Sequence, residues 1–345
     1  KRQIMYFYPV KSSQMATLIY LSIVGGLYFT AYTLVAAPYN ALIPDLATNK
    51  EERLNLSTMQ STFRLIFTGV AMVLPGILIS KFGMVNGVMN TEVGIRKTVI
   101  LITILSVLGI YACVFFLKEK QLTQNRPKSE SLGFMKSVSH LKDKEIILYF
   151  LGYFFFFCGF NILRGDLTYY LSAVMQKDIK FLTVISVILF GMAGLFFPIT
   201  NKFGKKYSYK KILIVDMLLL IVGTFGLLFI NKNTSIFAYV FFIICGTGLS
   251  GAAFIFPQAM LSEISAKLSE TKKVSLEGFM FGIQGMFLKL AFLVQQVVQS
   301  TLLVAGNNNT EGVKGATEFG VKVTLVVALI LFAASLFFYN LKKED

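Results

Sequence analysis

Nine long apolar stretches constrain this chain more than any other feature of its sequence. A helix that crosses a bilayer needs about 20 consecutive, mostly apolar residues. The stretches do not alternate between polar and apolar residues, as membrane-spanning strands would. The sequence therefore predicts an all-α, polytopic membrane protein with about nine transmembrane helices, at roughly 14–37, 57–81, 97–117, 146–172, 181–200, 212–230, 235–258, 278–304 and 318–340.

The composition excludes several classes of protein. With 55% hydrophobic and 15% charged residues, the chain lacks the polar surface of a soluble enzyme and the bias of a disordered chain. Cys113, Cys158 and Cys245 lie inside apolar stretches, so they indicate small core side chains rather than a disulfide scaffold or a metal site. His140 is the only histidine and no catalytic triad or metal-ligand spacing appears, so we predict no enzyme.

The distribution of Lys and Arg predicts the orientation. On one side of the membrane the connections carry 19 basic residues, and on the other side they carry 10. The richer side includes the C-terminus and the polar 118–145 connection, so both are predicted to be cytoplasmic in a multi-pass protein of the cell membrane. The net charge of +15 then reflects this bias and contact with anionic lipid headgroups, with no nucleic-acid partner.

Several short motifs resemble one transporter family. The segments PYNALIPDL (38–46) and ERLNLS (52–57) resemble the loop after the fourth helix in the glycoside–pentoside–hexuronide:cation symporters, a family of the major facilitator superfamily. The other motifs that match in order are GFN (159–161) with LTYY (167–170), KFGKK (202–206), LSEI (261–264), EG (277–278) and the intramembrane Lys289.

The resemblance implies a major facilitator fold of two helix bundles. Its nine helices would be numbers four to twelve of a twelve-helix template, and Lys1 would not be the true start of the protein. The expected divisions are a remainder of the N-terminal bundle at 1–117, a cytoplasmic connection at 118–145 and a C-terminal six-helix bundle at 146–345.

Lys289 is the strongest candidate for a substrate-binding residue. An ammonium near the middle of a membrane helix costs about 2.5–3.5 kcal/mol on insertion scales. It is therefore expected to face the bundle interior or a water-filled cavity, where the resemblance also places a functional lysine. The alternative is a buried lysine paired only with backbone carbonyls. For Arg64, a role in sugar binding and simple snorkelling toward the cytoplasmic face both stay open.

The remaining candidates fall into two groups. Polar and aromatic residues expected to line the cavity are Tyr32, Asn40, Asn161, Gln284 and Phe254. Charged residues expected to form a cytoplasmic gate are Glu263, Glu277, Asp216, Lys205 and Lys206.

Specific partners are expected for the gate charges. The two glutamates would pair with Lys267, Lys272, Lys273 and the basic KFGKK segment, and Asp216 would pair with Lys210 and Lys211. Arg164 and Asp166 are interpreted as a solvated pair at the outer rim.

Glycines indicate places where helices approach closely. Gly278 and Gly282 form a small-xxx-small pair, and Gly246, Gly248 and Gly251 crowd one short stretch.

The coupling ion is less well defined by the motifs. In the family, the cation site draws on carboxylates of helices two and four. Helix two would be absent from this chain, and the helix-four position aligns with Ala36. We therefore expect the site for Na⁺ or H⁺ to lie mainly on the missing helices, with no other cofactor or bound metal.

The sequence thus predicts a monomeric secondary transporter in the lipid bilayer that moves a sugar or glycoside together with a cation by alternating access. Two alternatives stay open. One is a lysolipid or amphiphile transporter on the same fold, favoured by Phe-rich helices and the absence of tryptophan. The other is a truncated membrane scaffold that transports nothing.

Overall fold

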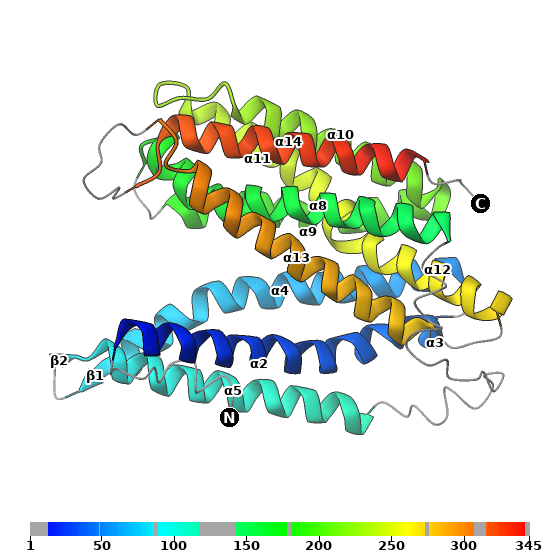
Figure 1. The fold of residues 1–345 in the computed structure, drawn as a ribbon, viewed down its shortest axis with the longest axis horizontal. Coiled ribbons are helices and arrows are strands. Elements are labelled where there is room, and N and C mark those ends of the chain that lie inside the picture. The colour runs from blue at the N-terminus through cyan, green and yellow to red at the C-terminus, as the bar shows by residue number, and fades with distance from the viewer. Residues whose placement is uncertain are drawn as a thin grey trace. The chain divides into compact units, whose positions relative to one another are not determined.

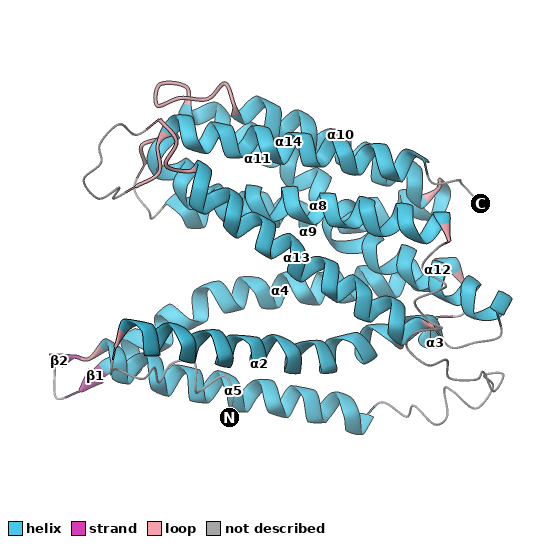
Figure 2. Cartoon of the chain, in the orientation of Figure 1, coloured by secondary structure: helices cyan, strands magenta, loops and turns pink. Residues whose placement is uncertain are grey.

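The computed structural model describes residues 13–47, 49–85, 88–116, 143–177, 181–272, 276–306 and 315–341. Helices make up nearly all of this part of the chain, with one short hairpin and a few loops between them (Figure 2). The described residues of all nine apolar stretches expected from the sequence are largely helical, so the all-α class is confirmed.

The chain divides into two compact units, which are described separately. The first comprises residues 1–46 and 63–128, and the second comprises 47–62 and 129–345. The expected division at 1–117, 118–145 and 146–345 stays a prediction. Residues 47–62, which follow the PYNALIPDL motif, pack with the second unit although the sequence places them within the first three helices.

The first unit contains α2 (Gln14–Ala41), the short α3 (Ile43–Leu46), the later part of α4 (Lys50–Gly83) and α5 (Thr91–Phe116). The strands β1 (Met84–Val85) and β2 (Val88–Met89) form an antiparallel hairpin between α4 and α5. Ser13 caps α2, because its hydroxyl accepts a hydrogen bond from the Ala16 amide at 3.1 Å.

The second unit is a bundle of longer helices. They are α8 (Lys144–Tyr169), which continues as the π-helix η2 (Tyr170–Val174), α9 (Phe181–Lys206), α10 (Tyr209–Leu227), the 3₁₀-helix η3 (Ser235–Phe237), α11 (Ala238–Leu249), the π-helix η4 (Ser250–Ile255), α12 (Phe256–Lys272), α13 (Glu277–Leu302) and α14 (Glu318–Leu341). In Figure 1, α14 runs beside α8 and α10, and α13 crosses α8.

Small residues allow the close packing of α8 against α14. A Cβ added at Gly152 would meet the Tyr339 ring at 3.0 Å, and one at Gly159 would meet the Phe332 ring at the same distance. The Ser335 hydroxyl donates a 2.6 Å hydrogen bond to the Gly152 carbonyl. Aromatic side chains and one buried hydroxyl thus hold these two helices together at the core of the second unit.

Seven helical segments in the described part of the chain are long and apolar enough to cross a membrane. They are Met15–Ala41, Glu92–Ala112, Lys144–Val174, Phe181–Lys206, Ser235–Thr271, Glu277–Leu302 and Glu318–Leu341. Two of the nine expected spans, α4 and α10, are helical but fall outside this set. Charge explains the difference for α10, which carries two lysines and an aspartate within 19 residues.

Candidate functional site

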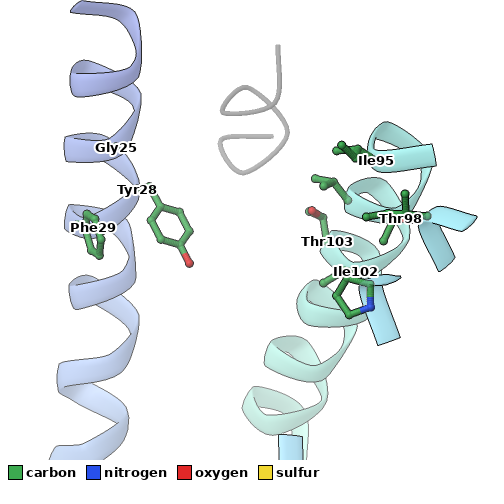
Figure 3. A pocket seen from close by; sticks show the side chains of 10 residues that line it. Gly25, Tyr28, Phe29, Ile95, Thr98, Ile102 and Thr103 are labelled. Atoms are coloured by element: carbon green, nitrogen blue, oxygen red, sulfur yellow. The ribbon is translucent and has the colours of Figure 1, made fainter. Parts of the chain in front are cut away.

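A cavity of about 550 Å³ lies within the first unit, between α2, α4 and α5. Figure 3 shows Tyr28 extending from α2 toward the α5 wall, where Thr98, Ile102 and Thr103 lie. Three hydroxyl groups are set in an otherwise largely carbon lining. The Thr98 hydroxyl is buried and has no hydrogen-bond partner among the described residues. None of the sequence-predicted site residues lines this cavity.

The residues expected to line a substrate cavity are divided between the two units. Tyr32, Asn40 and Arg64 belong to the first unit, where Tyr32 is 58% exposed and Arg64 is also exposed. Asn161, Phe254, Gln284 and Lys289 belong to the second. Their joint role stays a prediction.

Gln284 is bound inside the second unit. Its Nε2 donates to the Tyr149 hydroxyl at 2.8 Å and to the Pro257 carbonyl at 3.3 Å. The Tyr149 hydroxyl donates to the same carbonyl at 2.7 Å. All three groups are buried, so this cluster joins α8, α12 and α13 rather than presenting a free amide.

Asn161 and Phe254 are also buried. The Asn161 Nδ2 has no hydrogen-bond partner in the described structure, which leaves one amide group on α8 available for a ligand or water. Phe254 lies in η4 and packs edge-on against Phe197, with ring centroids 5.7 Å apart.

Lys289 lies near the middle of α13, twelve residues after the helix begins at Glu277 and thirteen before it ends at Leu302. Its side chain is partly exposed within the protein. From the middle of the helix, the Lys289 ammonium cannot easily extend to the water at either end of α13.

The charged residues expected at a gate meet partners that the sequence did not predict. Glu263 pairs with Lys50 at 3.4 Å, and Lys205 pairs with Glu51 at 2.8 Å. Lys50 also lies 4.5 Å from the centre of the Tyr209 ring, and its carbonyl accepts a hydrogen bond from the Tyr209 hydroxyl. The expected pairing of the two gate glutamates with Lys267, Lys272 and the KFGKK segment stays a prediction, and Lys273 lies outside the described residues.

Within the second unit, the start of α4 makes buried contacts with α9 and η4. Leu54 is fully buried, and its side chain would lie 3.1 Å from a Cβ added at Gly204. The Asn201 amide donates to the Thr58 hydroxyl at 2.7 Å and to Asn55 Oδ1 at 3.3 Å. The Ser61 hydroxyl donates to the Phe254 carbonyl at 2.7 Å. We call residues 50–62 the α4 docking segment.

Sequence reasoning assigned no function to the α4 docking segment, although it quoted the ERLNLS motif. A signal was present: Leu54, Ser57 and Ser61 are spaced by three and four residues, which places them on one helix face. All three are fully buried. Two serines on such a face would have indicated close contact between helices.

Three further gate residues have different surroundings. Lys206 lies over the Tyr207 ring at 5.4 Å, and Glu277 is only 7% exposed. The predicted ion pair of Asp216 with Lys210 and Lys211 is wrong. Asp216 is buried against η4, one of its carboxylate oxygens has no partner in the described structure, and the Lys210 ammonium donates to the Asn340 carbonyl at 2.8 Å.

The interpretation of Asp166 as a solvated rim residue is also wrong. Asp166 is 1% exposed and bonds to Gln299 on α13 and Thr324 on α14, while its neighbour Arg164 is exposed. The i, i+2 spacing puts the two side chains on different faces of α8.

The fold is that of the major facilitator superfamily. A FucP transporter of that superfamily in the outward conformation superimposes with a TM-score of 0.68 at 13% identity, covering 100% of this chain and 80% of that chain. A substituted variant of the E. coli fucose:proton symporter FucP gives 0.65 at 13% identity, covering 100% and 82%. No curated protein matches the sequence significantly.

The family follows from the sequence. The chain belongs to the MFS/sugar transport protein family, whose model matches residues 3–343. The protein is thus a multi-pass membrane transporter and not an enzyme, as the sequence predicted.

Proposed function

We propose that this protein is a cation-coupled symporter of a sugar or glycoside, of the glycoside–pentoside–hexuronide:cation type, which works by alternating access. The observation that carries the mechanism is the α4 docking segment. One helix contributes its first part to the second unit and its later part to the first unit. Such a segment can join the units in one state and be released in another.

The contacts of the docking segment suit a reversible joint. Its two ion pairs are partly exposed, and such pairs contribute only about 0.2–1 kcal/mol each. Burial of Leu54 contributes more, about 1.5–3 kcal/mol. The charges then serve mainly to set the alignment, and the apolar contact supplies most of the free energy that opening must overcome.

The proposed sidedness follows from the Lys/Arg bias. The docking segment forms ion pairs with Lys205 of KFGKK and Glu263 of α12, on the side predicted to be cytoplasmic together with the C-terminus and the 118–145 connection. The docking segment would therefore close the transporter on its cytoplasmic side. We propose that the protein acts as a monomer in the cell membrane. Lys289, Arg64 and the other predicted lining residues would bind the sugar.

Uptake into proteoliposomes tests this proposal. The purified chain would be reconstituted and offered radiolabelled fucose, xylose, melibiose and glucuronate, with an inward gradient of H⁺, an inward gradient of Na⁺ or neither. We expect accumulation of at least one sugar above its external concentration, only with a gradient. Absence of accumulation of any of these sugars under either gradient would contradict sugar symport.

A second candidate function is transport of an amphiphile such as a lysolipid. The observation in its favour is the largely apolar cavity of the first unit (Figure 3). Competition separates the candidates: excess unlabelled sugar should block uptake by a sugar symporter, whereas lysophospholipid should block uptake by an amphiphile transporter at concentrations that leave the vesicles intact.

A further inference from the structure

Asp166 is the least exposed acidic side chain in the described part of the second unit. At 1% exposure it is more buried than Asp216 at 5% or Glu277 at 7%. It lies on α8, and its carboxylate contacts side chains from α13 and α14. A carboxylate in such a position needs a compensating charge or a bound proton, because an ionised group without either is costly to bury.

One carboxylate oxygen accepts a hydrogen bond from an amide. The Gln299 Nε2 donates to Asp166 Oδ1 at 2.8 Å, and the Gln299 Oε1 in turn accepts from Gln295 Nε2 at 2.9 Å. The amide orientation is thus fixed by a second glutamine one turn away. Oδ1 has the role of the carbonyl oxygen of a carboxylic acid.

The other carboxylate oxygen and a backbone carbonyl oxygen both lie within hydrogen-bond distance of one hydroxyl group. Thr324 Oγ1 lies 2.6 Å from Asp166 Oδ2 and 2.8 Å from the Val321 carbonyl oxygen. A hydroxyl has one proton, and a backbone carbonyl can only accept. If Thr324 donates to Val321, the proton in the 2.6 Å contact comes from Asp166.

The charged and titratable groups on the surrounding elements do not neutralise Asp166. On α14, Lys322 is paired with Glu318 at 2.7 Å. On α13, Lys289 is ten residues before Gln299, about 15 Å along the helix axis. Arg164, two residues before Asp166 on α8, is exposed.

The titratable groups of η2, α9, α12 and the rest of α8 do not neutralise Asp166 either. The Tyr170 hydroxyl of η2 donates to the Leu227 carbonyl at 2.8 Å. Cys158 is two turns away on α8. The charges of α9 and α12 lie at the end that contacts the α4 docking segment, where Lys205 and Glu263 form ion pairs. Among the described residues, Asp166 takes part in no ion pair, and its hydrogen-bond partners Gln299 and Thr324 are neutral.

We propose that Asp166 is a proton-binding site, formed by α8, α13 and α14, which holds the carboxyl group neutral in this state through an Oδ2–H bond to Thr324. The inference deepens the proposed function, on which its role in transport rests, because it identifies H⁺ as the coupling cation. When α13 or α14 moves away and water enters, the proton passes to water and leaves a hydrated carboxylate. Re-closing the cluster requires a proton from solvent.

The helix sequence makes room for this site at Gly165. A Cβ at this position would lie 2.3 Å from Gln299 Nε2 and 2.7 Å from Gln295 Nε2. Any larger residue would displace both amides, so glycine permits the glutamine pair to reach the carboxyl group.

Infrared spectroscopy of the purified, detergent-solubilised protein tests the site without transport. We expect a carboxylic acid C=O band at neutral pH that loses intensity in Asp166→Asn, whose side-chain amide reproduces the same donor pattern. Any contribution from the buried Asp216 should remain. The matched control Glu318→Gln removes an exposed, ion-paired carboxylate and should leave the band unchanged. A C=O band of unchanged intensity in Asp166→Asn, or no such band in the unmodified protein, would overturn the proposal.

A second pair of variants covers the case in which Asp166→Asn does not fold. Thr324→Val removes the acceptor of the proton and should shift the band, whereas Thr324→Ser keeps the hydroxyl and should preserve its position. A band unmoved by Thr324→Val would also overturn the assignment.

Transport distinguishes this proposal from the proposed function. With fucose, or with whichever sugar of the panel the unmodified protein takes up, Asp166→Asn should retain exchange across the membrane and lose accumulation driven by H⁺. Accumulation at the normal level in that variant would overturn the coupling role. If the unmodified protein moved no sugar, the proposed function would fail while the infrared result still decided the proton site.

Discussion

At the scale of single residues, buried polar groups of the second unit find partners on other helices. Gln284 reaches Tyr149 across 135 positions of sequence, and Thr324 reaches Asp166 across 158. Sequence patterns place such residues on a helix, but they do not reveal a partner so distant. For this reason the depth of Lys289 was predictable from its helix, whereas the surroundings of Asp166, Asp216 and Gln284 were not.

Lys289 carries the residue-level prediction for substrate binding. We expect Lys289→Ala to abolish coupled uptake of the transported sugar in proteoliposomes, with normal expression and folding, because the ammonium is the only cation near the middle of α13. Lys322→Ala, which breaks an ion pair near the start of α14, should keep uptake. Normal accumulation by Lys289→Ala would remove this residue from the site.

Tyr149 carries a prediction for stability. Tyr149→Phe deletes the hydroxyl that joins Gln284 to the Pro257 carbonyl and leaves buried polar groups with fewer partners. We expect a loss of about 1–3 kcal/mol, seen as a lower melting temperature in detergent. Tyr169→Phe alters a more exposed tyrosine of the same helix and should change little. Equal melting temperatures for the two variants would contradict a stabilising cluster.

At the scale of elements, the sequence predicted the position of every long helix but not the ends. The expected 57–81 stretch is α4 over Lys50–Gly83, because the charged turn at its start continues the helix beyond the apolar residues. Hydropathy detects only the part of a helix that suits a membrane. Here the part that it misses is the α4 docking segment.

The glycines also show what sequence patterns leave undetermined about helix packing. Gly248 is closely packed, since a Cβ there would lie 2.4 Å from the Asp216 carbonyl oxygen on α10. Gly278 and Gly282 were interpreted as a packing pair, but an added Cβ at either would meet no heavy atom within 4 Å in the described structure. Spacing alone does not show which glycines lie against another helix.

The two kinds of glycine give the prediction at this scale. Gly248→Ala should force α10 and α11 apart and destabilise the protein by about 1–3 kcal/mol. Gly282→Ala should be neutral or slightly stabilising, because alanine favours a helix over glycine by about 1 kcal/mol. Thermal unfolding of both variants in the same detergent measures the difference. A melting temperature lowered equally by both would contradict the packing described here.

At the scale of the whole molecule, the proposed transport mechanism depends on α4, whose first residues belong to the second unit and whose later residues belong to the first. The two residues Asn55 and Asn201 report directly on its docked state, since their side chains lie 3.3 Å apart. The family follows from the sequence match over residues 3–343. The contacts of the α4 docking segment are known only from the structure.

The most direct test of the account is therefore sugar uptake by the double variant Asn55→Cys/Asn201→Cys, before and after oxidation. The account predicts uptake near background when the disulfide holds the docking segment in place and recovery on reduction, while each single cysteine variant transports in both conditions. Cross-linking would be confirmed by the mass of the joined proteolytic peptides. Uptake at the reduced rate in fully cross-linked protein would contradict the claim that the α4 docking segment must be released for transport.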